Sequence, residues 1–220
     1  MQHYARFLCA WRVGLLCLAL AACDSGGSWH SVDVEHRLPP LRFALSRASD
    51  GRAVTASDYR GKVALVYFGY AGCSDACPTT LADLGYVLKR LGDKADQVRV
   101  LFVTVDPGRD SLSALKRYTA LFAPQVVGLR GSDDQLAAMV RRYRAAYSTK
   151  AVAGGLSYEV SHSTSVYVFD QTGAARLLIP ALDVSHDIEG TAADLRRIIG
   201  EAPPSAQWRH SQIPRPSASG

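Results

Sequence analysis

The 220-residue sequence lacks the features that mark several whole classes of protein. Its apolar runs fall well short of the roughly 20 residues that a membrane-spanning helix needs, which excludes a polytopic membrane protein. Charge is nearly balanced, with 25 Lys and Arg against 20 Asp and Glu and no basic cluster, so we expect no nucleic-acid partner. No internal repeat is present. The remaining composition, 48% hydrophobic and 20% charged, is typical of a globular domain with a full core.

The first 22 residues have the pattern of an export signal. Residues 1–12 are polar with arginines, residues 13–22 are apolar or small, and residues 20–23 read Leu-Ala-Ala-Cys. This ending resembles the bacterial lipobox, in which the cysteine is acylated and becomes the first residue of the mature chain. We therefore expect Cys23 to carry a lipid that holds the protein at the periplasmic face of the cell membrane. Ordinary signal cleavage beside an incidental cysteine is the alternative.

The chain has five cysteines, and few of them remain for the mature domain. Cys9 and Cys17 leave with the signal and Cys23 is assigned to the lipid, which leaves Cys73 and Cys77. A structural disulfide is the first interpretation of a lone pair in an oxidising compartment. A bridge between residues four apart closes a very short loop, which stabilises a fold least. The pair therefore favours a chemical role.

The sequence divides into four parts. Residues 1–22 are the signal, and residues 23–40, with Gly-Gly and Pro-Pro pairs and no apolar period, are predicted to be a lipidated tether. A domain over 41–200 follows. Residues 201–220 hold four prolines and several serines without periodicity, so we expect a disordered tail.

Within the domain, the spacing of apolar residues predicts alternating strands and helices. Residues 63–68 and 98–105 are apolar, β-branched runs typical of buried central strands. Helical periods occur between them, after the capping residues Ser111 and Ser132, and in a last helix that opens at residues 191–194. Residues 148–161 show no period and are expected to form a loop, and residues 164–169 and 175–179 flank a hairpin turn at 170–173. The order predicts an α/β fold with a mixed central sheet flanked by helices, the layout of a thioredoxin-like fold.

Cys73 and Cys77 lie where the first central strand gives way to the first long helix. Open α/β sheets bind ligands beyond the carboxyl ends of their strands, and a helix N-terminus stabilises a thiolate. The spacing leaves both a shared metal and a disulfide open. His162 lies just before a later strand; alone it is more often a capping or core residue, but with two thiolates it forms a soft ligand set. This set suits Cu(I), or Cu(II) with a further ligand, whereas structural zinc needs a fourth protein ligand that does not stand close by in sequence.

Four segments, in order, resemble the Sco (SenC/PrrC) family of copper-binding cytochrome oxidase assembly proteins. They are residues 67–78 with the CxxxCP pattern, residues 105–110 with DPxRD, residues 125–131 and residues 162–165. The resemblance covers about 41–200. It implies that Cys73, Cys77 and His162 bind copper. It also implies a partner, the copper-bearing subunit of cytochrome c oxidase or another copper or thiol protein.

Other polar residues near these motifs have two interpretations each. Asp106 follows a central strand and either orients the metal site or only forms an Asp-Pro-Gly turn. Arg109 and Asp110 are expected to cap the next helix and pair with neighbours, and Tyr67 and Tyr70 to support the cysteine loop by packing. Beyond the signal, four histidines lie outside the motif. His30, His36 and His210 are expected to be solvated surface residues, and His186 is expected in a polar loop before the last helix.

Two function classes follow. The first is a metallochaperone, which is not an enzyme. The second is a membrane-anchored thiol-disulfide oxidoreductase that uses Cys73 and Cys77 without metal. Thioredoxin-like oxidoreductases typically use CxxC and a cis-proline, where this chain has CxxxC and His162, which favours metal. A peroxiredoxin would need the missing PxxxTxxC pattern, and a purely structural lipoprotein leaves the thiols unexplained.

Overall fold

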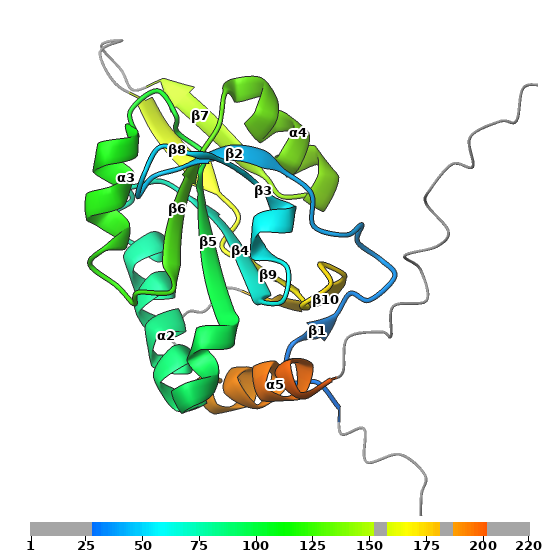
Figure 1. Cartoon of the computed structure of the whole chain (residues 1–220). Coiled ribbons are helices and arrows are strands. Elements are labelled where there is room, and N and C mark those ends of the chain that lie inside the picture. Colours follow the sequence, from blue (N-terminus) through cyan, green and yellow to red (C-terminus); the bar gives the residue numbers. More distant parts are fainter. Residues whose placement is uncertain (1–27, 152–157, 181–186, 202–220) are drawn as a thin grey trace, which may run out of the picture.

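The computed structural model describes residues 28–151, 158–180 and 187–201 (Figure 1). The elements in chain order are β1 (Val32–Asp33), β2 (Ala44–Arg47), β3 (Ala53–Thr55), η1 (Ala56–Tyr59), β4 (Val63–Gly69), α2 (Ala76–Leu91), η2 (Gly92–Gln97), β5 (Val98–Thr104), α3 (Leu112–Thr119), β6 (Val126–Arg130), α4 (Asp133–Tyr143), β7 (Tyr147–Ala151), β8 (Tyr158–His162), β9 (Val166–Phe169), β10 (Ala175–Ile179) and α5 (Ile188–Gly200).

A mixed eight-stranded sheet forms the centre, in the order β1-β10-β9-β4-β5-β6-β2-β3. Strands β4, β5 and β6 are parallel neighbours, while β9 pairs antiparallel with β4 and continues into the hairpin with β10. The parallel strands therefore end at the same edge. This arrangement confirms the predicted mixed sheet and the hairpin.

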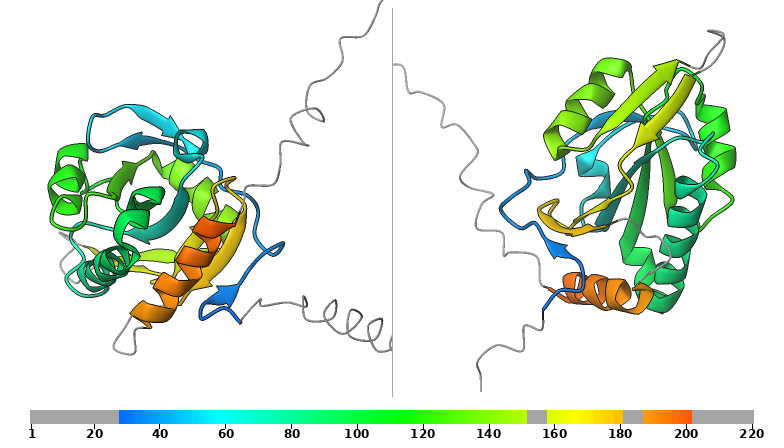
Figure 2. Two further views of the ribbon diagram at one scale, coloured as in Figure 1. Left: turned by 60° about the horizontal axis from the view of Figure 1, so that its bottom comes forward. Right: turned by 180° about the vertical axis from the view of Figure 1, so that it is seen from behind.

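Strand β4 is buried on both faces, which explains its unbroken apolar run. Val63, Leu65 and Tyr67 point into a core shared with α2, α3 and α5. Ala64 and Phe68 point into the opposite core, which α4 and η1 cover. The two further views in Figure 2 show helices on both sides of the sheet. Helices on both faces make a layered α/β domain.

The helix starts follow local capping chemistry. The Ser111 hydroxyl accepts a hydrogen bond from the Ala114 amide at the start of α3, and Ser132 forms a capping box with Gln135 at the start of α4, as predicted. The predicted start of α5 at residues 191–194 is wrong. The carboxylate of Asp187 accepts the Gly190 amide instead, so α5 begins at Ile188.

The expectation of a loop over residues 148–161 is also wrong at both of its ends. Strands β7 and β8 pair antiparallel, from Tyr147 opposite His162 to Ala151 opposite Tyr158. Most of their side chains are exposed, so no apolar alternation announces them. The rear view in Figure 2 shows this two-stranded sheet along one side of the domain. It carries His162 to the site.

The segment before Leu41 belongs to the folded domain, which corrects the predicted tether for residues 28–40. Strand β1 pairs with β10. The amides of His30 and Ser31 donate to the buried carboxylate of Asp194, at 3.1 and 2.8 Å. Backbone hydrogen bonds of this kind require no apolar period, so the sequence pattern does not reveal them. The predicted signal, Cys23 and most of the predicted tail lie outside the described residues.

We predict that removing this segment destabilises the domain. A chain that starts at Leu41 loses β1 and both amides that donate to the Asp194 carboxylate, which should cost about 1–3 kcal/mol. A chain that starts at Ser28 keeps both hydrogen bonds and is the matched control. Urea denaturation of the two chains measures the free energies of unfolding; equal values contradict the prediction.

Candidate metal centre

The two cysteines lie on the short connection between the end of β4 and the first turn of α2. Cys73 is in the loop and Cys77 is in the helix. The Asp75 side chain makes no capping hydrogen bond, and the amide of Cys77 instead donates to the Cys73 sulfur at 3.4 Å. Helix N-termini carry such free amides, and a negative sulfur accepts from them best. The start of α2 therefore supplies a hydrogen-bond donor to the Cys73 sulfur.

Gly69, the last residue of β4, makes room for the second sulfur. A Cβ atom at this position would lie 2.6 Å from the Cys77 Sγ and 2.6 Å from the Phe102 ring. Such contacts are shorter than any van der Waals distance, so a larger residue would displace the sulfur. Gly69 also accepts the Val105 amide at 2.8 Å, which ties the ends of β4 and β5 together. The glycine thus sets the depth at which Cys77 lies.

His162 comes from the opposite direction, at the end of β8. Its Nε2 lies 3.3 Å from the Cys77 Sγ, and the ligand atoms of Cys73, Cys77 and His162 all lie within 4.8 Å of one another. Cys77 is fully buried, while Cys73 and His162 are half-buried. The structure thus brings together the three residues that the sequence analysis predicted as ligands, although Cys73 and His162 lie 89 positions apart in the chain.

The ring of His162 is held in one orientation. Its Nδ1 lies 3.0 Å from the Ser163 carbonyl oxygen, which can only accept, so Nδ1 is the donor of this hydrogen bond and Nε2 is the nitrogen that faces the Cys77 sulfur. Tyr67 and Tyr70 pack edge-on against the imidazole, with ring centroids 6.0 and 5.8 Å away. Both tyrosines therefore have the packing role expected of them.

Burial dominates the electrostatics of the deeper thiol. It raises the pKa of Cys77 to about 12, above the ordinary range of a cysteine, because the surroundings disfavour a charged sulfur. Burial likewise raises the pKa of the Tyr67 hydroxyl. At neutral pH Cys77 is therefore a thiol, and a metal that binds its thiolate must displace a proton.

Asp106 forms the predicted turn and also contacts the strand that carries His162. Its carbonyl accepts the amides of Arg109 and Asp110. Its buried carboxylate accepts from the Tyr158 hydroxyl at 2.6 Å and from Arg109, whose guanidinium stacks on the Tyr158 ring at 4.1 Å. Tyr158 begins β8. Asp106 therefore acts on the site through β8, and its carboxylate is not part of the three-residue cluster.

The expectation that Arg109 and Asp110 cap the next helix is wrong, while the expected pairing of Arg109 with a neighbour is confirmed. Arg109 pairs with Asp106, but Ser111 supplies the cap of α3. The Asp110 side chain turns back toward the cysteine loop and accepts the Ala71 amide. No sequence signal separates this contact from an ordinary cap, because the two residues lie 39 positions apart.

The remaining histidines differ from one another. His36 is exposed, as expected. His30 is half-exposed but is not merely solvated, because its Nδ1 lies 2.9 Å from the Asp187 carboxylate. His186 and His210 lie outside the described residues.

The donor set fits a soft metal ion. Two sulfurs and one imidazole nitrogen converge, and among the described residues the cluster has no fourth histidine, cysteine or carboxylate. Structural zinc sites normally have four protein ligands, whereas Cu(I) accepts three or fewer. The geometry therefore favours copper over structural zinc.

Comparison with known proteins places this geometry in a family. The SCO1/SenC family model matches residues 41–200. The chain belongs to the SCO1/SenC family. The mitochondrial SCO2 homolog of Bos taurus is 35% identical over 178 residues, covering 74% of this chain and 67% of that protein. The fold of this SCO1/SenC member is therefore that of its relatives.

Two solved structures of SCO1/SenC relatives share the architecture. Copper-bound ScoI from Bradyrhizobium japonicum is 33% identical, with a TM-score of 0.64, covering 72% of this chain and 98% of that one. Apo Sco1 from Thermus thermophilus is 30% identical, with a TM-score of 0.69, covering 80% and 99%. The SCO1/SenC chain thus has the predicted thioredoxin-like fold.

We predict that the two thiols of this SCO1/SenC protein differ in reactivity. With a pKa of about 12, the Cys77 thiolate is only about one part in ten thousand at pH 8, and it is buried. Iodoacetamide should therefore modify Cys73 first in the reduced protein. The Cys77 rate should rise about tenfold for each pH unit up to 11, because each unit increases the thiolate fraction tenfold. Peptide mass spectrometry measures both rates; faster modification of Cys77 at pH 8 contradicts the assignment.

Proposed function

We propose that this protein is a copper metallochaperone that holds copper through Cys73, Cys77 and His162 and delivers it to a partner. The observation that carries the proposal is the approach of three soft donor atoms to within 4.8 Å at the end of the central strands. Delivery requires binding and release but no turnover, so the protein acts as an assembly factor and not as an enzyme.

The chemistry of the three donors supports copper as the cargo. Thiolates and imidazole select Cu(I), and a site with three protein ligands leaves Cu(II) a free position for a further ligand. Relatives support the same assignment: ScoI from Bradyrhizobium japonicum, ScoI from Arabidopsis thaliana and yeast Sco1, 28–33% identical to this chain, are described with copper bound.

The difference in burial between the ligands supports a route for release. Cys73 and His162 are half-buried and therefore face the side from which a partner approaches, while Cys77 is fully buried behind them. Ligands of a partner can replace the two outer donors before the inner one. The family resemblance supports the copper-bearing subunit of cytochrome c oxidase as the acceptor, with another copper or thiol protein as the alternative.

A thiol-disulfide oxidoreductase is the second candidate. The half-buried Cys73 at a helix N-terminus, with Cys77 behind it, is an arrangement that suits attack on a partner disulfide. The imidazole 3.3 Å from the Cys77 sulfur favours the metal, since a ligand set explains all three side chains at once.

We predict that the reduced domain binds one copper ion and that each ligand has a distinct effect. Cys73→Ser or Cys77→Ser removes half of the thiolate set and should abolish tight binding. His162→Ala leaves two sulfurs, which still hold Cu(I), but should hold Cu(II) poorly because that ion needs more ligands. Stoichiometry in both oxidation states and the thiolate-to-Cu(II) absorption band measure the effects.

His36→Ala is the matched control, because His36 is exposed and away from the site. It should bind copper as the natural protein does. An unchanged Cu(II) spectrum in His162→Ala would show that His162 is not a copper ligand. It would then favour the thiol-disulfide oxidoreductase.

The proposed location is the periplasmic face of the cell membrane, with a lipid on Cys23. The pattern of residues 1–23 supports it. In the part of the chain that the structure describes, no helix has both the length and the apolar character to cross a membrane.

We predict that Cys23→Ser releases the mature protein from the membrane fraction without unfolding the domain, because the described fold starts at residue 28. Cell fractionation with mass spectrometry of the N-terminal peptide measures both location and lipid. A Cys23→Ser protein that stays as membrane-bound as the natural one contradicts the anchor.

A further inference from the structure

Asp110 is a buried carboxylate that neither binds copper in the proposed site nor caps a helix. Only 3% of it is exposed. Its Oδ2 accepts two hydrogen bonds, from the Ala71 amide at 2.9 Å and from the Thr104 hydroxyl at 2.6 Å. A buried carboxylate is costly unless such donors satisfy it. The side chain thus joins the cysteine loop to the end of β5.

The first of these bonds fixes the loop close to a proposed ligand. Ala71 lies two residues before Cys73, and the Cys73 amide donates to the Tyr70 carbonyl at 3.1 Å, which closes a turn around Ala71. The loop beyond it is exposed at Gly72 and Ser74. Asp110 is therefore the side chain that ties this turn to the sheet.

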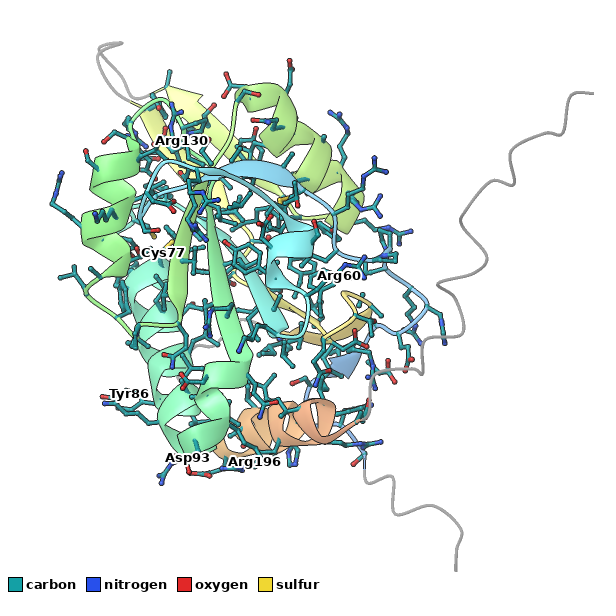
Figure 3. All side chains as sticks on the ribbon, in the orientation of Figure 1. Arg60, Cys77, Tyr86, Asp93, Arg130 and Arg196 are labelled. Atoms are coloured by element: carbon teal, nitrogen blue, oxygen red, sulfur yellow. The ribbon has the colours of Figure 1, made fainter. Side chains whose placement is uncertain are left out.

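Asp110 is itself held by the neighbouring strand. Arg130, at the end of β6, donates from Nε to the Asp110 carbonyl at 3.0 Å and from a terminal nitrogen to the Pro107 carbonyl at 2.8 Å. Figure 3 shows Arg130 on the same upper part of the molecule as Cys77. Arg130 therefore holds the turn after β5 at two carbonyls, which fixes the position of the Asp110 carboxylate.

We infer that Asp110 is the positioning residue of the metal centre, which holds the turn at residues 70–73 so that the Cys73 sulfur lies close to the Cys77 sulfur and the His162 Nε2. The inference rests on the proposed function and adds to it the residue that sets the geometry of the outer thiolate. Hydrogen-bonded partners of this kind orient the ligands of a metal and tune its affinity.

Because both hydrogen bonds end on one oxygen, the role depends on an acceptor and not on charge. The amide oxygen of an asparagine can accept both bonds. Asp110→Asn should therefore keep the position of Cys73, while Asp110→Ala leaves the Ala71 amide and the Thr104 hydroxyl without an acceptor. Comparison of the two variants therefore separates the loss of the hydrogen bonds that position Cys73 from the loss of the negative charge of Asp110.

The experiment measures Cu(I) affinity by competition with a chromophoric chelator and records the thiolate-to-Cu(II) absorption band. Asp110→Ala should weaken affinity about 10–100-fold and shift or broaden the band, and Asp110→Asn should restore both. Wild-type affinity and spectrum in a folded Asp110→Ala protein overturn the inference. So does an Asp110→Asn protein as impaired as Asp110→Ala.

Asp194→Ala is the matched control for a general loss of stability. Asp194 is also a buried carboxylate that accepts two amides, but it lies on α5. It should lower the thermal midpoint and leave copper affinity unchanged; an equal loss of affinity overturns the inference. If Asp110→Ala does not fold, Thr104→Val is the second variant, because it removes one of the two donors to the Asp110 carboxylate. It should also weaken copper affinity. Wild-type affinity in Thr104→Val then overturns the inference.

A copper-free measurement separates this inference from the proposed function. In glutathione buffers the Cys73 and Cys77 thiols together lose two electrons and two protons to glutathione disulfide, forming a protein disulfide and two glutathione thiols. A loosened turn lowers the effective concentration of Cys73 beside Cys77, so Asp110→Ala should lower this equilibrium constant several-fold, with Asp110→Asn near wild type. Absence of copper binding in the natural protein rejects the proposed function, whereas an unchanged thiol equilibrium in Asp110→Ala rejects the positioning role.

Discussion

The close contact between Gly69 and the Cys77 sulfur is the constraint on which the site depends. It places the sulfur against the last residue of a strand that is buried on both faces, so its position is defined by the whole sheet and not by a surface loop. Burial at that point also keeps the thiol protonated until a metal displaces the proton. The same packing thus excludes water from the sulfur and makes a metal compete with a proton for it.

The other two side chains of the cluster both depend on the turn that follows β5, the parallel neighbour of β4. His162 arrives on β8, which Asp106 and Arg109 hold through Tyr158. Cys73 arrives on a turn that Asp110 holds from the end of β5. The Asp-Pro-Gly-Arg-Asp segment therefore supports both outer side chains of the proposed site, one with each carboxylate. The two carboxylates of this one turn contact different elements. Asp106 contacts β8 and Asp110 contacts the cysteine loop, so a single turn supports both sides of the site.

Much of this arrangement could be predicted from sequence. The strands β4 and β5, the caps of α3 and α4 and the three-residue cluster follow from apolar runs, capping residues and the family pattern. What could not be predicted depends on contacts between distant backbone groups: β1 on β10, and Ala71 on Asp110. The exposed hairpin of β7 and β8 was missed because few of its side chains are buried, which leaves the sequence without an alternating signal.

The pairing of β1 with β10 has a consequence for the proposed lipid-anchored form, because it brings the sheet close in sequence to Cys23. With a lipid on Cys23, four residues lie between the anchor and Ser28, where the described structure starts, and the chain can span at most about 17 Å between them. Residues 30 and 31 contact α5, and α5 meets the far end of α2 through Arg90. Helix α2, with 16 residues, is about 24 Å long, and Cys77 lies at its opposite end from Arg90. Figure 3 shows Arg196 of α5 at the end of the molecule away from Cys77. In the proposed lipid-anchored form, the domain therefore holds the cluster of Cys73, Cys77 and His162 away from the bilayer, and a copper acceptor would meet it at about one domain length from the membrane.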